Sequence, residues 1–307
     1  MSAWDEVLRR DAPEHGWAQD CYLGGAEPLP TGTPLDDALG GGLMPGVTVL
    51  GGVASAGKSA IACHAAASVA DSGGRVLYLT LDDSWGNVMA RCMSAWSVSR
   101  SASYGSSAFS WSQLPGMRRR WRDLSDSDRS RVACEGRDAA LMAARAWEAG
   151  PGKRLAVVDS VTEIGQVEAM LRELREEGEA PSLVVVDYVQ QYQAGSPELD
   201  RSEYSRVSDV AARLQRLALW GGVPMLALSS LRKLSKGDDE PTLDWFRGSG
   251  VVGYSAWAAC VLAKGERSGP GWREAVINVV KNKGGRSGTR VSFELWGGYS
   301  YSGKVIG

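Results

Sequence analysis

The chain has 307 residues, of which 44% are hydrophobic and 23% are charged, and its formal net charge is −2. This composition is typical of a globular protein and excludes wholesale disorder. The near-neutral charge gives no overall attraction to nucleic acid or to a membrane surface, so a nucleic-acid site has to be a local basic surface. No apolar run approaches the roughly 20 residues that cross a bilayer, and we expect no membrane association.

Five cysteines are scattered without a Cys-x-x-Cys pair, and only two histidines are present. This pattern argues against a structural zinc site, and unpatterned thiols are typical of a reducing compartment. The N-terminus lacks the basic and apolar segments of a signal peptide. We therefore expect a cytoplasmic protein.

The first thirty residues mix one short possible helix with connections that are rich in glycine and proline. They are too few to form a core, and we interpret residues 1–30 as an N-terminal arm or linker. From Thr31 the pattern becomes an alternation of strands and helices. We therefore predict one α/β domain over residues 31–307.

Short apolar runs alternate with amphipathic segments along this domain. The first run, Val47 to Leu50, ends at Gly51-Gly52 and precedes a helical stretch from Lys58 to about Ala70. Further apolar strands are expected at residues 75–81, 155–158, 183–186 and 224–228, with a helix over 207–217 before the last. Fully apolar strands that alternate with helices predict a parallel sheet with helices on both faces.

The C-terminal part has a different pattern. Strands are expected at residues 257–263, 275–280 and 290–295, joined by glycine-rich turns, and together they predict an antiparallel extension of the sheet. The serine-rich stretch 99–113 is the best candidate for a loop.

Residues Gly52 to Ser59 match the pattern Gly-x-x-x-x-Gly-Lys-Ser/Thr in full. The glycines let successive N–H groups face phosphate oxygens, and the following helix adds the positive end of its dipole. Lys58 supplies a charge for the β and γ phosphates, and Ser59 supplies a hydroxyl for Mg²⁺. The sequence therefore predicts an ATP hydrolase that uses ATP and Mg²⁺. The predicted nucleotide-binding residues of this loop are Gly52, Val53, Ala54, Ser55, Ala56, Gly57, Lys58, Ser59 and Ala60.

A P-loop ATPase also needs an aspartate at the carboxyl end of a neighbouring strand to hold the water shell of Mg²⁺. Asp159 and Asp187 each follow an apolar strand, and periodicity alone does not choose between them. Asp82 and Asp83 close another strand, where a carboxylate can accept a proton from the attacking water. An ordinary helix N-cap is the alternative for that pair.

The order of these segments resembles the C-terminal motor domain of DnaB-type replicative helicases over roughly residues 31–302. The resemblance rests on Thr31-Gly32, Leu35-Asp36, Gly42 to Gly46, Leu79 to Asp82, Asp187-Tyr188-Val189-Gln190, Ser208 to Ala218, Leu228 to Leu231, Phe246 to Gly250 and Val280 to Gly284.

The resemblance implies a role for several of these residues. It favours Asp187 as the Mg²⁺ carboxylate beside Ser59, Asp82 as the catalytic carboxylate, and Gln190 as a further residue of the nucleotide site. Arg247, Gly248 and Gly250 stand in a loop that contacts the DNA backbone in the family. Lys281 and Lys283 stand in a hairpin that in the family reaches the ATP site of the next subunit, and the resemblance implies a catalytic role there for both lysines.

Three positions depart from the family pattern. Asp82 replaces a glutamate, Ser230 replaces a glutamine that senses the γ-phosphate, and Lys283 replaces an arginine finger. Lysine neutralises charge but lacks the bidentate fork of arginine. These departures bear on strand separation, whereas the expectation of ATP hydrolysis rests on the phosphate loop.

The resemblance implies that residues 31–307 are a RecA-like ATPase motor domain. It further implies an ATP-dependent DNA helicase or translocase on single-stranded DNA. It would act as a homo-oligomeric ring, a hexamer, with ATP between subunits and with a primase or loader as a partner. Two alternatives remain open, namely a RadA-like recombinase that forms filaments and a KaiC-like regulatory ATPase that switches a protein partner.

Overall fold

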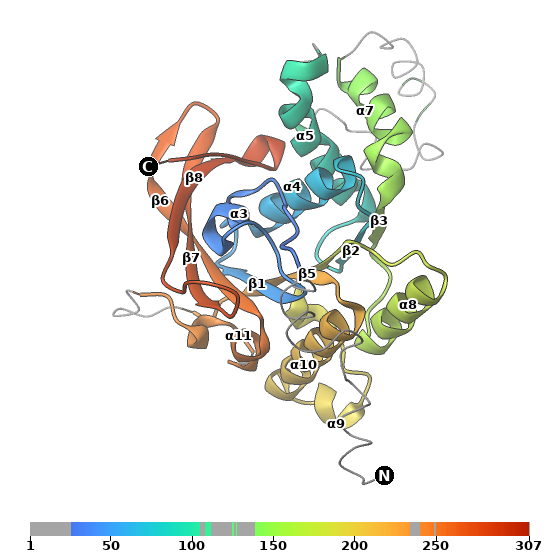
Figure 1. Cartoon of the computed structure of the whole chain (residues 1–307), viewed down its shortest axis with the longest axis vertical. Coiled ribbons are helices and arrows are strands. Elements are labelled where there is room, and N and C mark those ends of the chain that lie inside the picture. Colours follow the sequence, from blue (N-terminus) through green and yellow to red (C-terminus); the bar gives the residue numbers. More distant parts are fainter. Residues whose placement is uncertain are drawn as a thin grey trace, which may run out of the picture.

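The structure is a computed structural model that describes residues 26–104, 108–111, 125, 127, 139–233, 240–248 and 250–306. The expected N-terminal arm falls almost entirely outside these residues, as does Ser249 of the expected DNA loop. Within them, nine strands form one sheet in the order β3-β2-β4-β5-β1-β6-β7-β8-β9. Figure 1 shows β6, β7 and β8 on one side of β1, and β2 and β3 on the other. The strands are β1 (Gly46–Gly52), β2 (Val76–Thr80), β3 (Leu155–Val158), β4 (Leu183–Asp187), β5 (Pro224–Ser230), β6 (Ala258–Gly269), β7 (Trp272–Asn282), β8 (Arg290–Trp296) and β9 (Tyr301–Val305).

Helices cover both faces of this sheet, as the alternation of apolar strands predicted. The α-helices are α3 (Pro34–Leu39), α4 (Lys58–Asp71), α5 (Trp85–Tyr104), α7 (Ala139–Ala149), α8 (Ile164–Glu176), α9 (Pro197–Asp200), α10 (Glu203–Gly221) and α11 (Val251–Ser255). The 3₁₀ turns are η4 (Pro151–Arg154), η5 (Val189–Gln191), η6 (Leu243–Trp245) and η7 (Gly297–Tyr299). None of the helices in the described part of the chain is long and apolar enough to cross a membrane.

Successive strand residues enter two separate cores. In β4, Leu183 and Val185 pack with α4 and α5, whereas Val184 and Val186 pack with α8 and α10. The same division is visible in Figure 1, where α4 and α10 lie on opposite sides of the central strands. Strands buried on both faces carry apolar residues at every position, which is why these runs show no polar alternation.

The parallel part of the sheet extends further than expected. The strand predicted at 257–263 is not purely part of the antiparallel extension, because β6 pairs in parallel with β1 and antiparallel only with β7. The extension therefore begins at the β6–β7 pair and continues through β8 and β9. The last strand, β9, was not predicted, because its sequence Tyr-Ser-Gly-Lys-Val contains no apolar run.

The loop prediction for residues 99–113 is wrong for its first part, because α5 continues to Tyr104. Three serine hydroxyls in this helix donate to backbone carbonyls three or four residues earlier: Ser97 to Ser94, Ser99 to Ala95 and Ser101 to Val98. Serine disfavours helices mainly when its hydroxyl competes for the backbone, and here the hydroxyls bond within the helix. Residues 112–113 lie outside the described part.

The last strand is attached to the helix that follows the phosphate loop. His64 of α4 is buried, and its Nδ1 lies 2.8 Å from the hydroxyl of Ser302 in β9. The imidazole also stacks against Tyr301, with ring centroids 4.3 Å apart. Burial lowers the pKa of His64 to about 4, so the ring is neutral at physiological pH and accepts from Ser302.

Candidate nucleotide-binding site

The phosphate loop lies between the carboxyl end of β1 and the start of α4. Gly57 caps this helix with a φ of +112°, a conformation that favours glycine. Val53, Ala54 and Ser55 are exposed, whereas Gly52 is buried. The loop is thus anchored by buried elements and open at its tip, at the mouth of the parallel sheet. Helix N-termini in this position bind anions, because their first N–H groups have no partner within the helix.

Lys58 folds back over this loop. Its Nζ donates to the carbonyl oxygens of Gly52, at 2.8 Å, and Val53, at 3.3 Å. Burial lowers the pKa of Lys58, and the neighbouring carboxylates of Asp187 and Asp82 counteract this shift. The ammonium therefore lies between the loop backbone and two acidic side chains, where a positive charge fits the phosphates of a nucleotide.

Asp187 ends β4 and is 3% exposed. Its carboxylate accepts a hydrogen bond from the Tyr78 hydroxyl at 2.9 Å and another from the Ser59 hydroxyl. Burial raises the pKa of Asp187, while these two bonds and the charge of Lys58 counteract the rise. Burial next to this carboxylate raises the pKa of Tyr78 well above its usual value, so the phenol remains a donor. A hydroxyl and a carboxylate are oxygen ligands of the type that Mg²⁺ prefers.

The strand that carries Asp187 is not the direct neighbour of β1 that we expected, because β5 lies between them. Helix α4 packs across β1, β5 and β4, so its first turn brings Ser59 to Asp187. Asp159 is farther away, after β3, which has β2, β4 and β5 between it and β1. Its carboxylate accepts from the backbone N–H of Trp85 at 2.8 Å, at the start of α5. Of the two aspartates, only Asp187 thus contacts the phosphate-loop residues.

This difference between the two aspartates is testable. We expect Asp187→Asn to weaken Mg²⁺-dependent hydrolysis by about 10- to 100-fold, as is typical when an outer-shell partner of a metal is lost. Asp159→Asn should leave the Mg²⁺ dependence unchanged, because asparagine caps a helix as well as aspartate does. Hydrolysis rates measured over a Mg²⁺ titration give both results. A raised Mg²⁺ requirement in Asp159→Asn alone would reverse the assignment.

Asp82 and Asp83 have different surroundings. The Asp83 carboxylate accepts from the Asn87 amide at 2.7 Å and lies 3.5 Å from the Arg91 guanidinium, so it is engaged with α5. Asp82 accepts from the Gln191 amide at 3.3 Å, and its charge acts on Lys58. Asp82 is therefore the carboxylate of this pair that faces the phosphate loop.

Two residues of the antiparallel extension support the phosphate loop and were missed by the sequence argument. The guanidinium of Arg273 in β7 donates to the carbonyl oxygens of Ser55, at 3.0 Å, and Ala56. Leu295 in β8 lies so close to Gly57 that a Cβ there would come within 2.3 Å of its Cδ2. More than 200 residues separate Arg273 from the loop, and nothing in the local sequence marks the contact.

Lys281 and Lys283 lie at the amino ends of the parallel strands, opposite the carboxyl ends that carry the phosphate loop. Asn282 pairs with Ala258 at the start of β6, and β6 runs parallel to β1, so these lysines lie away from Gly52. The ammonium of Lys281 donates to the carbonyl oxygens of Gly253, at 3.3 Å, and Tyr254 in α11. Burial lowers the pKa of Lys281, with Lys283 adding to the effect. Lys283 is exposed on the turn after β7.

Gln190 and the Arg247 loop lie at the carboxyl ends of the parallel strands, as the phosphate loop does, because Gly52 is in register with Ser230 in β5. The Gln190 side chain bonds to Ser229, Ser230 and the carbonyl of Arg247 rather than to the phosphate loop. Its predicted role in nucleotide binding stays a prediction. The Arg247 side chain is 57% exposed, and its Nε lies 3.1 Å from the Glu203 carboxylate.

The two glycines of this loop have different conformations. Gly248 follows Arg247 with a φ of +88°, and Gly250 precedes α11. A Cβ at Gly248 would also approach Val207 Cγ2 at 3.1 Å, so glycine suits both the turn and the close packing against α10.

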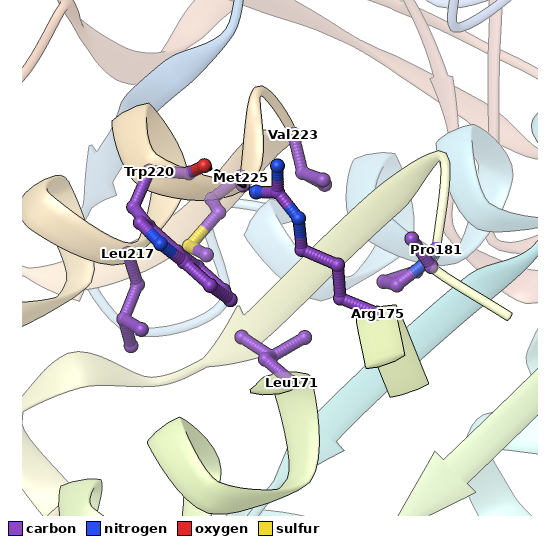
Figure 2. Close-up of a pocket in the computed structure, with 9 residues that line it drawn as sticks. Leu171, Arg175, Pro181, Leu217, Trp220, Val223 and Met225 are labelled. Atoms are coloured by element: carbon purple, nitrogen blue, oxygen red, sulfur yellow. Dashed lines mark hydrogen bonds between the residues drawn. The ribbon is translucent and has the colours of Figure 1, made fainter. Parts of the chain in front are cut away.

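A separate pocket between α8 and α10 does not contribute to this site. Its volume is only about 20 Å³, little more than one water molecule occupies. Figure 2 shows Arg175 beside Trp220, with the guanidinium carbon 4.5 Å from the ring centroid. The lining also includes Met225, near the amino end of β5, so the pocket lies at the opposite end of the strands from the phosphate loop.

Solved structures share this fold. A DnaB-like replicative helicase, described with its interactions with primase, has 17% identity and a TM-score of 0.70, over 98% of this chain and 67% of that chain. The ATPase domain of G40P has 17% identity and a TM-score of 0.70, over 98% of both chains. The KaiC-like protein PH0186 from Pyrococcus horikoshii OT3 has 15% identity and a TM-score of 0.57, over 92% of this chain and 100% of that chain. At these identities the similarity establishes the RecA-like fold.

The family follows from a comparison of the sequence itself. No curated protein matches the chain. The profile of the DnaB-like helicase C terminal domain matches residues 29–295, which include the phosphate loop, Asp187, the Arg247 loop and the Lys281–Lys283 hairpin. The chain therefore belongs to the family of DnaB-like helicase C-terminal domains.

Proposed function

We propose that this chain is an ATP-driven translocase or helicase on single-stranded DNA that works as a ring, with ATP bound between subunits. The observation that carries the proposal is the division of the site between the two ends of the parallel strands of one sheet. Lys58, Ser59, Asp82 and Asp187 converge at the carboxyl ends of the parallel strands, whereas Lys281 and Lys283 lie at the amino ends. One copy cannot bring both sets together, but two adjacent copies in a ring can.

The residues at the carboxyl ends of the strands have complementary roles in hydrolysis. Lys58 neutralises the β and γ phosphates, and the loop amides orient them. Ser59 and Asp187 hold Mg²⁺, which, when bound, neutralises charge that develops on the transferred phosphoryl group. Asp82 orients the attacking water and accepts its proton. The bond from Gln191 keeps Asp82 turned towards this place.

The lysines at the amino ends of the strands complete the site of the neighbouring copy. Lys283 is exposed on the turn and provides a positive charge for the neighbour's γ-phosphate. Lys281 is bound to α11 carbonyls and reaches the same phosphate only after leaving them. The motor unit in this proposal is residues 31–307, with residues 1–30 as an arm.

Arg247, Gly248 and Gly250 form the DNA contact in this proposal. Arg247 is the exposed positive charge of the loop, and such side chains bind the phosphate backbone without reading sequence. Replacing Arg247 with glutamine should lower the slope of log Kd against log salt concentration by about 0.7 for each phosphate that the arginine neutralises, measured by fluorescence anisotropy with single-stranded DNA. Arg290→Gln, which removes an exposed arginine from β8, is the matched control. Equal slopes for the wild type and Arg247→Gln would exclude this role of Arg247.

The function itself is tested by ATPase rates with and without single-stranded DNA, beside electron micrographs of the same sample. We expect DNA to stimulate hydrolysis and the particles to be closed six-membered rings. Filaments would favour a RadA-like recombinase. Absence of stimulation would favour a KaiC-like regulatory ATPase, a candidate supported by Asp82 and Ser230, which depart from the helicase pattern. A primase or loader as partner and a cytoplasmic location complete the proposal.

A further inference from the structure

The Gln190 side chain is bonded on three sides. Its amide nitrogen donates to the Ser229 hydroxyl at 2.8 Å and to the Arg247 carbonyl at 2.9 Å, and its oxygen accepts from the Ser230 N–H at 3.3 Å. With 6% of the residue exposed, water cannot readily replace these bonds. A change at Gln190 therefore acts on both the end of β5 and the Arg247 segment.

One end of this connection is the nucleotide site. Gln190 lies in η5, a single turn that begins two residues after Asp187. The Arg206 guanidinium donates to the Gln190 carbonyl at 3.2 Å and holds the main chain of the turn. The next residue, Gln191, donates to Asp82. This short turn connects both carboxylates of the site to the Gln190 amide, Asp187 through the chain and Asp82 through Gln191.

The other end is the segment that carries Arg247. Trp245 to Arg247 runs antiparallel to the chain that leaves β5. The Arg247 N–H donates to the Ser230 carbonyl at 2.9 Å, and the Arg232 N–H donates to the Trp245 carbonyl at 2.7 Å. The segment is thus an extra strand-like layer on the end of β5.

This segment is also held against the phosphate-loop strand. A Cβ on Gly51 would lie 2.6 Å from the Phe246 ring, so β1 and Phe246 are in close contact. Immediately after Arg247 the chain turns at Gly248. Gln190 therefore binds the last carbonyl before this turn, where a small rotation changes the direction of the Arg247 side chain.

We propose that Gln190 is a positioning residue that transmits nucleotide occupancy to Arg247 and so sets the grip of the loop on a single strand. The inference rests on the proposed function, because it assigns Gln190 to the path between the two sites of that motor. Gln190 acts through Arg247 and not on the phosphates. A purely structural bond would stabilise the fold without changing how Arg247 responds to nucleotide.

The test is hydrogen–deuterium exchange of the peptide that spans residues 243–248, with and without Mg²⁺ and a non-hydrolysable ATP analogue. In the wild type, we expect the analogue to change exchange of this peptide by about fivefold or more, the lower limit of typical site-to-site coupling. In Gln190→Met, the response should fall below about half of that value. Binding of the analogue is measured in parallel with a fluorescent derivative.

Gln215→Met is the matched control. Gln215 is also buried, at 9% exposure. Its side chain accepts from the Val47 N–H at 3.0 Å, at the amino end of β1. Its replacement removes a comparable buried bond far from Arg247. We expect a lowered melting temperature in this variant but the full response of the 243–248 peptide to nucleotide.

A second variant removes the donors of the Gln190 side chain and keeps its acceptor. In Gln190→Glu, the carboxylate still accepts from the Ser230 N–H, but it has no proton to donate to the Arg247 carbonyl or to the Ser229 hydroxyl. The exchange response should be lost in this variant as well. It also replaces Gln190→Met as the test if the methionine variant does not fold.

The outcomes separate the two proposals. A wild type that binds no nucleotide would overturn the proposed function and this inference together. A wild type that binds nucleotide without a change in the 243–248 peptide, or a Gln190→Glu variant that responds fully, would overturn this inference alone. Loss of the response in Gln190→Glu but not in Gln215→Met supports it, whether or not DNA stimulates hydrolysis.

Discussion

Replacing Lys58 with alanine should lower the rate of ATP hydrolysis by about 10²- to 10³-fold, the typical cost of removing a preorganised charge or donor from a developing negative charge. The ammonium is held at the phosphate loop by the carbonyls of Gly52 and Val53, and alanine leaves no charge at this position. Phosphate release at saturating ATP and Mg²⁺ measures the effect.

The fold should survive this change. Lys58 is partly desolvated, as the lowered pKa indicates, and alanine removes a charge whose burial is unfavourable. The melting temperature should therefore move by no more than a few degrees. Lys304→Ala, which removes an exposed lysine from β9, should leave hydrolysis unchanged. Wild-type rates in Lys58→Ala would disprove the phosphate-loop assignment.

Replacing Asp82 with asparagine should lower kcat by about 10²- to 10⁴-fold, the usual contribution of a general base. Asparagine preserves the shape and can still accept from Gln191 through its carbonyl oxygen, but it cannot take a proton from water. Single-turnover hydrolysis separates this effect on chemistry from any effect on nucleotide affinity.

Asp83→Asn is the internal comparison. Asp83 is paired with Asn87 and Arg91, so its replacement should loosen the start of α5 and reduce kcat far less. Asp82→Glu keeps the carboxylate and should retain most of the activity. If Asp83→Asn proved the slower variant, the general base would have to be reassigned to Asp83.

Features with a local cause could be predicted from the sequence. The strand, loop and helix around Gly52 to Ser59 were expected because glycine spacing and apolar periodicity act over a few residues. The two-sided sheet followed from the uninterrupted apolar runs of β2 and β4. The helical continuation of α5 was not foreseen, because its serine hydroxyls bond back to carbonyls of the same helix.

Features that depend on strand order could not be derived in this way. Asp159 and Asp187 have the same local pattern, and only the position of β3 at the edge and β4 near the centre separates them. The same holds for β6, which looks like its antiparallel neighbours but pairs in parallel with β1. Pairing between distant segments is set by packing of the whole sheet, which a local window does not contain.

The contacts of Arg273 and Leu295 have a consequence for how this nucleotide site is built. A phosphate loop is usually regarded as an independent signature that any strand–helix junction can carry. Here, its backbone oxygens and its second glycine rest against β7 and β8, and the Arg273 that makes the contact follows Ser55 by 218 residues. A chain that is cut before these strands therefore possesses the signature but lacks the buttress, so competence for the triphosphate requires that β7 and β8 have joined the sheet.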